Sequence, residues 1–161
     1  MIVVGGIAAA ALILGSAVWW WRRRWTVMTI DGPSMAPTYR SGDRVAVRRC
    51  RPADVVVGEI VVFHDPTGGG QPPLLIKRVV ALGGDPTPAS VHRAMVITAN
   101  ADSDRLSGLL AEEPAPVPPG HLVVLSDAGH GTDSRSFGYL PVTAVEGIVV
   151  RRLASAPEPA A

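Results

Sequence analysis

Hydrophobic and polar positions follow two different patterns along this chain, and the first is a long apolar run. Residues Ile2 to Trp21 carry no charge and end in three tryptophans, which three arginines follow. As a helix rising ~1.5 Å per residue, this run can cross the ~30 Å hydrocarbon layer of a bilayer, with the tryptophans at its interface. A cleaved secretory signal fits less well, because no basic residue precedes the run. The pattern predicts an uncleaved single-pass anchor over residues 1–24.

The second pattern is apolar alternation in short segments bounded by glycine and proline, which is typical of strands. The predicted strands are residues 44–48, 58–63, 74–82, 122–125 and 145–151, with a weaker candidate at 94–98. Residues 101–113 fit either a short helix or an irregular segment, and residues 154–161 contain too few apolar side chains to pack. We therefore predict a mainly β domain with an antiparallel sheet over residues 25–153, preceded by one transmembrane helix and followed by a disordered tail.

Composition supports this picture and excludes several classes. The chain has 161 residues, a net charge of +1 and 18% charged residues, so its bulk charge indicates no nucleic-acid partner. Its 17 glycines, 15 prolines and 5% aromatic residues suit strands and turns better than a helical bundle. The lone Cys50 cannot form an internal disulfide, and paired-cysteine zinc sites are excluded. The sequence indicates no metal site and no cofactor.

Candidate chemistry begins with a serine and a lysine. Ser34 lies between Pro33 and Pro37, which restrict the backbone on both sides. Lys77 is the one lysine among 15 basic residues, and alternation places it on an apolar strand. The simpler interpretations are a turn-forming serine and an edge-strand lysine that reaches water.

A buried lysine would allow a different chemistry. A free amine with a pKa of about 10.4 is neutral in only ~0.04% of molecules at pH 7, but burial lowers a lysine pKa. A neutral Lys77 amine could take the proton of the Ser34 hydroxyl as that hydroxyl attacks a carbonyl. Arginine could not replace it, because arginine stays protonated.

Beyond Ser34 and Lys77, several longer blocks follow one another along the chain: Gly32-Pro33-Ser34-Met35-Ala36-Pro37-Thr38-Tyr39, Gly42 to Val47, Gly58 to Phe63, Lys77 to Asp85, and Val117 to Asp127 followed by Asp133 to Gly138. In this order, the blocks resemble those of the membrane-bound type I signal peptidases. An ordered set of blocks is far more specific than any one of them. The resemblance implies a β-sheet serine endopeptidase with a Ser-Lys dyad.

The resemblance also implies roles for individual residues. Ser34 would be the nucleophile, Lys77 the general base, and the Ser34 N–H a donor to the oxyanion beside Gly32, which lacks the side-chain donor that some relatives have there. Shallow apolar pockets, to which we assign Met35 and Ile76, would select small residues before the cleaved bond. Four residues would be structural supports: Arg78 paired with Asp127, and Asp133 and Arg135 bracing the loop beside Lys77.

One block departs from the family pattern. Related enzymes have a serine that hydrogen-bonds the lysine, and Gly131 stands in its place here. Thr132 or Ser126 could supply the missing hydroxyl. A Ser-His-Asp triad using His130 is the less favoured alternative, because the loop around His130 is polar and glycine-flanked.

The expected activity is removal of signal or leader peptides from exported precursors. The expected partners are precursor proteins and the lipid bilayer, and the sequence does not indicate an oligomeric state. Charge after the anchor favours a cytoplasmic domain, whereas signal-peptide removal needs the extracytoplasmic side, which we favour. The alternatives are a peptidase dedicated to one precursor, a self-cleaving repressor-like Ser-Lys protease, and a membrane-tethered β module without activity.

Overall fold

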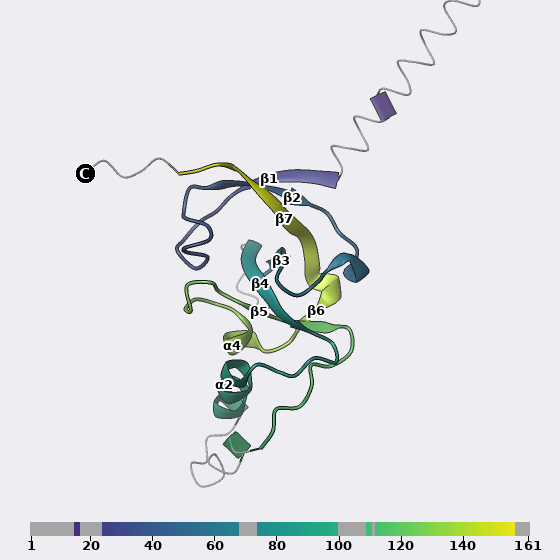
Figure 1. Ribbon diagram of the computed structural model, residues 1–161, viewed down its shortest axis with the longest axis vertical. Helices are drawn as coiled ribbons and strands as arrows, with labels where there is room; N and C mark the ends of the chain where they lie inside the picture. The colour runs from purple at the N-terminus through teal and green to yellow at the C-terminus, as the bar shows by residue number, and fades with distance from the viewer. Residues whose placement is uncertain (1–14, 17–23, 68–73, 100–108, 111, 157–161) are drawn as a thin grey trace, which may run out of the picture.

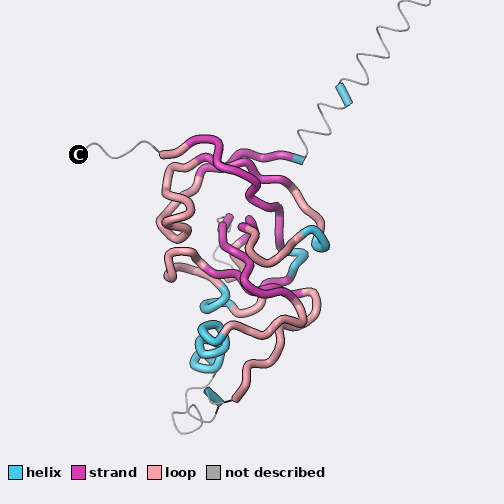
Figure 2. The backbone as a smooth tube through the Cα atoms, in the orientation of Figure 1, coloured by secondary structure: helices cyan, strands magenta, loops and turns pink. Residues whose placement is uncertain are grey.

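The structure is a computed structural model that describes residues 15–16, 24–67, 74–99, 109–110 and 112–156. Strands dominate the described chain, as the alternation predicted (Figures 1 and 2). They are β1 (Trp25–Thr29), β2 (Arg44–Arg48), β3 (Ile60–His64), β4 (Leu74–Leu82), β5 (His121–Leu125), β6 (Leu140–Pro141) and β7 (Val145–Ala154). The helices are η1 (Pro52–Asp54), α2 (Ala89–Ala99), α4 (Ser134–Phe137) and η2 (Val142–Ala144).

These strands form one antiparallel sheet in the order β1-β2-β7-β3-β4-β5-β6. Figure 1 shows β1, β2 and β7 at one end of the domain, with α2 at the other. Strand β4 pairs with β3 along Leu74 to Arg78, but β5 joins its other side only from Arg78 onward. Apart from the outer side of β6, the described chain therefore leaves two strand edges without a partner, one on β1 and one on the first half of β4, which are called the two open strand edges below.

The core lies on both faces of this sheet because successive side chains along its central strands are apolar and point to opposite faces. One cluster includes Met35, Val45, Val62 and Ile76, and a second includes Phe63 and Leu122. Phe63 is completely buried and meets Phe137 edge to face, with ring centroids 6.0 Å apart. Two layers of side chains thus hold β3 and β4 in the middle of the molecule.

The strand prediction at residues 94–98 is wrong, because these residues belong to helix α2. The run of Met, Val and Ile favours a strand locally, but tertiary packing overrides such propensity. Val91 and Met95, one helical turn apart, both pack in the third core cluster. Strand β1 was not predicted, because its WTVMT sequence showed no clear alternation.

The predicted membrane anchor and the predicted disordered tail lie at the two ends of the chain. Among the described residues, no helix combines the length and the apolar character needed to span a bilayer. The predicted anchor falls outside the described residues except for Gly15, Ser16 and Arg24. The expectation of a disordered tail is wrong at its start, because Ala154 belongs to β7 and the Ala156 N–H donates to Asp43 Oδ1 at 2.8 Å. Most of the segment 101–113 lies outside the described part of the chain.

Candidate active site

Ser34 lies in a tight turn that its neighbours hold in place. The Ala36 N–H donates to the Pro33 carbonyl at 3.0 Å, and the Met35 side chain is buried in the core with 1% exposure. The Ser34 carbonyl accepts a hydrogen bond from the Ala128 N–H at 3.1 Å. The half-buried serine is therefore fixed on both sides, by the core below it and by the loop that follows β5.

Lys77 meets this serine from strand β4. Its side chain is only 2% exposed, and its Nζ lies 2.8 Å from Ser34 Oγ, within hydrogen-bond distance. Burial lowers the pKa of Lys77, while the negative charge of Asp133 opposes that shift. The structure thus brings together a hydroxyl and an amine that are 43 residues apart in sequence, with the amine biased toward its neutral form.

A cleft of about 90 Å³ opens beside the pair. Met35 and Ile76, predicted to line a substrate pocket, both line it and are both buried. The cleft is bordered by Met28, Thr29, Ile30, Asp31, Ser34, Met35, Leu74, Leu75, Ile76 and Lys77. These residues come largely from β1, the Ser34 turn and the first half of β4, so the cleft lies between the two open strand edges.

Backbone donors near Ser34 differ in their availability. Gly32 has a φ of +83°, in the left-handed region that favours glycine, and its N–H donates to Ser41 Oγ at 3.2 Å. The N–H of Ser34 donates to no atom of the residues that the structure describes. Of the two, the Ser34 N–H is therefore the one open to an oxyanion. Ser41 was not anticipated from the sequence, where nothing marked it as a partner of Gly32.

Arg78, the residue after Lys77, ties four segments together. Its Nε and Nη2 donate to the two Asp127 carboxylate oxygens at 2.8 and 2.6 Å, a bidentate pair. Its Nη1 donates to the Gly58 carbonyl at 2.8 Å, and Nη2 also donates to Thr38 Oγ1 at 3.3 Å. The Arg78 guanidinium lowers the pKa of Asp127. The pair joins β4 to the loop after β5 and to the Ser34 turn.

Asp133 and Arg135 form a second ion pair, close enough to Lys77 for the Asp133 charge to act on it. Arg135 donates to both Asp133 carboxylate oxygens, from Nε at 2.9 Å and from Nη2 at 2.5 Å. Burial alone would raise the pKa of the fully buried Asp133, but hydrogen bonds from Arg135 and from the Ser126 N–H outweigh burial and lower it. Asp133 thus favours its charged form, and its negative charge raises the pKa of Lys77.

Ser126 stands out in the loop where the family serine is missing. Its side chain is 6% exposed and its Oγ has no hydrogen-bond partner in the described structure, although the hydroxyl contributes slightly to the lowered pKa of Asp133. A Cβ built on Gly131 would lie 3.4 Å from Ser126 Oγ and 3.2 Å from Ser34 Cβ. The Ser126 hydroxyl therefore lies beside the space where a serine at position 131 would place its side chain, and Thr132 is half-buried nearby in the chain.

Within the described chain, His130 forms no hydrogen bond with Ser34 or Lys77. It is exposed, and its Nδ1 lies 3.0 Å from the Ala128 carbonyl oxygen. Among the described residues, no group of three His, Cys, Asp or Glu side chains is placed to hold a metal ion. A triad through His130 is therefore not the arrangement found.

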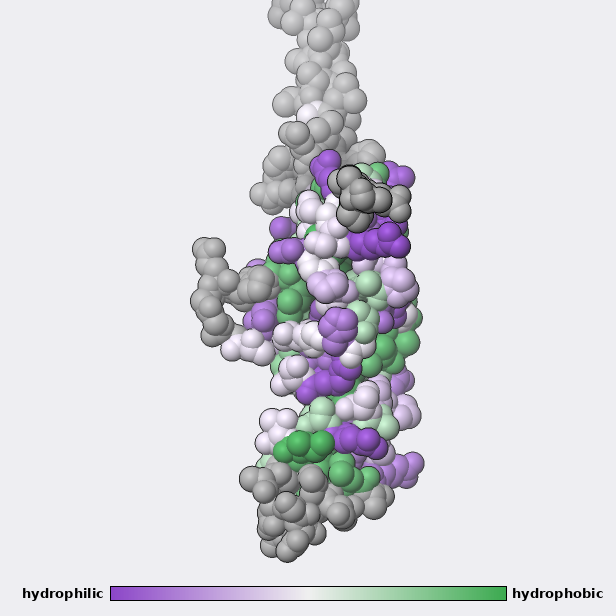
Figure 3. Space-filling model, turned by 90° about the vertical axis from the view of Figure 1, so that its left-hand side faces the viewer, coloured by the Kyte–Doolittle hydropathy of each residue, from purple (hydrophilic) through white to green (hydrophobic). Residues whose placement is uncertain are grey.

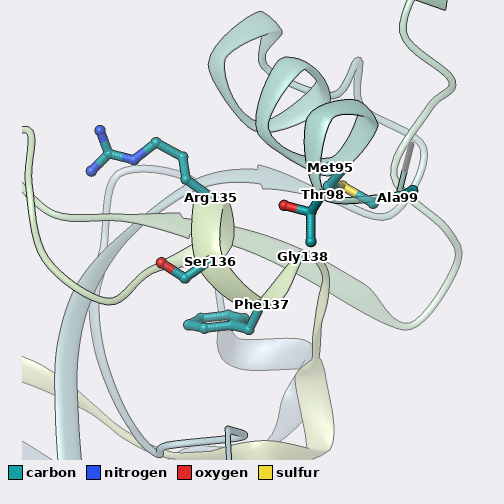
Figure 4. Close-up of a pocket in the computed structure, with 7 residues that line it drawn as sticks. All are labelled: Met95, Thr98, Ala99, Arg135, Ser136, Phe137 and Gly138. Atoms are coloured by element: carbon teal, nitrogen blue, oxygen red, sulfur yellow. The ribbon is translucent and has the colours of Figure 1, made fainter. Parts of the chain in front are cut away.

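A larger cavity, of about 250 Å³, lies on the far side of Arg135, between α2 and α4. Figure 4 shows Met95, Thr98 and Ala99 on the α2 side and Phe137 and Gly138 on the α4 side. On the face shown in Figure 3, hydrophobic residues gather at the α2 end of the molecule. This cavity contains neither Ser34 nor Lys77, so its size alone does not make it the reaction site.

An antiparallel β domain that holds a serine and a buried lysine in contact beside open strand edges has the features of a hydrolase for extended peptides. Residues 3–154 match the family described as signal peptidase, peptidase S26. The chain therefore belongs to the signal peptidase family, and with it to the serine peptidases of signal-peptidase type. A search among curated proteins gave no significant match.

Proposed function

We propose that this chain is a membrane-anchored endopeptidase that removes signal or leader peptides from exported precursors, with Ser34 as nucleophile and Lys77 as general base. The observation that carries the proposal is the 2.8 Å contact between Lys77 Nζ and Ser34 Oγ, with a lysine that is 2% exposed. Geometry and burial together provide what a lysine base needs, namely reach and a lowered pKa.

The reaction proceeds in two stages. Neutral Lys77 takes the proton from Ser34 Oγ as that oxygen attacks the scissile carbonyl, and the resulting ammonium gives the proton to the leaving amine. Water then attacks the acyl-serine, with Lys77 again taking a proton, and the free serine is restored. The Ser34 N–H donates to the carbonyl oxygen as negative charge develops on it.

The two open strand edges explain how a precursor could be held. An extended peptide can pair with β1, with the Leu74–Lys77 half of β4, or with both, by main-chain hydrogen bonds. Alternate side chains of such a peptide would then face Met35 and Ile76. The cleft is small, at about 90 Å³, which fits cleavage after small residues.

The test uses the full chain in neutral detergent micelles and precursor peptides that carry alanine before the expected cleavage point. Cleavage products identified by mass spectrometry should end at a small residue, and Ser34→Ala should abolish them. A peptide with bulky residues at the same positions is the matched control and should remain intact. Cleavage that persists in Ser34→Ala would remove the proposal, and no cleavage by the native chain would favour a non-enzymatic tethered β module.

A further inference from the structure

A strongly basic cavity lies away from the Ser34 cleft and from the cavity between α2 and α4. It has a volume of about 510 Å³ and lies between the start of β1, the end of β2 and η1. We call it the basic cavity. It is lined by Arg24, Arg48, Arg49, Cys50, Arg51 and Asp54. Four of these six side chains are arginines and only one is a carboxylate, so the cavity suits an anionic ligand.

Backbone contacts fix this cavity at the point where the chain leaves its apolar N-terminal segment. The Arg49 N–H donates to the Arg24 carbonyl at 2.9 Å, and Trp25 is the register partner of Arg48. Figure 1 shows η1 and the start of β1 on the same side of the domain. The uncharged run that ends at Trp21 stands only three residues before Arg24. If that run spans a bilayer, the basic cavity lies at the level of the lipid head groups.

The single acid of the cavity is already engaged. Asp54 accepts hydrogen bonds from the Arg51 N–H at 3.0 Å and from Arg51 Nη2 at 3.4 Å. Within the described part of the chain, Arg48 and Arg49 form no ion pair. Burial raises the pKa of the Cys50 thiol, so this side chain adds no negative charge near neutral pH. The lining is therefore left with an excess of positive charge.

We propose that the basic cavity binds the phosphate of an anionic phospholipid head group. Guanidinium groups match phosphate oxygens in a bidentate geometry, and the lining of the cavity is mostly polar. A basic side chain near an anionic membrane surface strengthens binding by about fivefold. The proposal rests on the membrane anchoring in the proposed function, and it makes the head group a second point of attachment for the catalytic domain.

The lone cysteine provides a reporter, because Cys50 lines the cavity. The full chain is placed in lipid nanodiscs of phosphatidylcholine alone, or of phosphatidylcholine and phosphatidylglycerol in equal parts, and the rate of Cys50 modification by N-ethylmaleimide is measured. Phosphatidylglycerol should slow the modification several-fold. In the double variant Arg48→Gln/Arg49→Gln, head-group binding falls about 25-fold, by about fivefold for each arginine, and the slowing should disappear.

The matched control is Arg44→Gln/Arg93→Gln, which removes the same charge from two exposed positions outside the cavity. It should retain the slowing, and each variant is compared with itself in the two lipids so that changes in thiol reactivity cancel. Equal rates in both lipids for the native chain, or equal slowing in both double variants, would overturn the proposal. Glycerol phosphate in neutral nanodiscs should not protect Cys50; protection by it would assign the cavity to a soluble phosphate instead.

Hydrolysis of a short soluble peptide in neutral micelles, together with circular dichroism, is measured on the same preparations. The cavity variants should keep both, since none of their residues touches the Ser34 cleft. Lipid-dependent protection without peptide hydrolysis by the native chain would leave the head-group site standing and remove the peptidase assignment. Hydrolysis without protection would do the reverse.

Discussion

Lys77 and Arg78 are neighbours on strand β4, yet the two sides of that strand give them opposite surroundings. Lys77 is 2% exposed, contacts the Ser34 hydroxyl, and has a pKa that burial lowers. Arg78 forms a bidentate contact with Asp127, which raises the pKa of the guanidinium. Two cations one residue apart are therefore driven in opposite directions, one toward loss of its proton and the other toward firm retention.

The difference follows from the twofold period of a strand, which sends successive side chains to opposite faces. Lys77 shares its face with Leu75 and Val79, which belong to the apolar cluster around Phe63 and Leu122. An unpaired charge is costly in such surroundings. The other face, which carries Arg78, meets the loop after β5, and Asp127 of that loop supplies a carboxylate. Arginine suits the second setting because of its fork of donors, and lysine suits the first because it can become neutral.

Exchanging the two cation types gives the largest expected effect. Lys77→Arg keeps the positive charge but cannot supply a neutral base, so kcat/KM for peptide cleavage should fall by about 10³-fold or more. The matched control, Arg78→Lys on the next residue of the same strand, keeps the charge and loses the guanidinium that contacts Asp127, the Gly58 carbonyl and Thr38. It should lower kcat/KM by about tenfold or less. Comparable losses in the two variants would show that the two faces of β4 do not have separate roles.

Loss of the Arg78–Asp127 pair should mainly lower the free energy of unfolding. Asp127→Ala leaves the Arg78 guanidinium without its carboxylate and loosens the link from β4 to the Ser34 turn. Breaking a partly buried pair of this kind should lower the free energy of unfolding by about 2 kcal/mol, somewhat below the value for fully buried pairs because the Arg78 side chain is 32% exposed. Urea unfolding measures the loss. Unchanged stability would mean that the contact contributes nothing to the fold.

The pH dependence of cleavage tests the protonation of Lys77. In the proposed mechanism only neutral Lys77 acts as a base, so kcat/KM should rise with pH as the amine loses its proton, and burial should place this rise below the ordinary lysine pKa of about 10.4. Asp133 raises the Lys77 pKa, so Asp133→Asn should move the rise to lower pH. Rates at a series of pH values, with circular dichroism to verify folding, measure both. A rise that stays in place when Asp133 is neutralised would exclude the charge coupling.

The sequence allowed most of the sheet and the central pair to be predicted, for reasons visible in particular residues. Strands β2 and β4 have the predicted bounds because each is rich in Val, Leu or Ile and lies close to glycine or proline. Ser34 and Lys77 were found because the serine lies between prolines and the lysine is unique. Their contact spans 43 residues, and it could be anticipated only from the family resemblance, not from local pattern.

What the sequence left open depends on contacts between distant segments. Helix α2 was misread because Val91 and Met95 gain their packing partners from other elements. The hydrogen bond from the Gly32 N–H to Ser41 likewise depends on how the turn folds back over nine residues. The choice between Thr132 and Ser126 could not be made either, since it depends on which hydroxyl the loop after β5 turns inward.

The smallest expected effect distinguishes between these hydroxyls. Ser126→Ala should lower kcat by a few-fold, because a buried hydroxyl beside the dyad can accept a hydrogen bond from the Lys77 ammonium once Ser34 is acylated, whereas Thr132→Val should change kcat less. Gly131→Ser restores the serine of related enzymes but should not raise activity. Gly131 has a φ of +108°, and a Cβ there would lie 3.2 Å from Ser34 Cβ. Single-turnover kinetics of the three variants measure the effects, and the hydroxyl at position 126 loses its positioning role if Ser126→Ala matches the native chain while Thr132→Val does not.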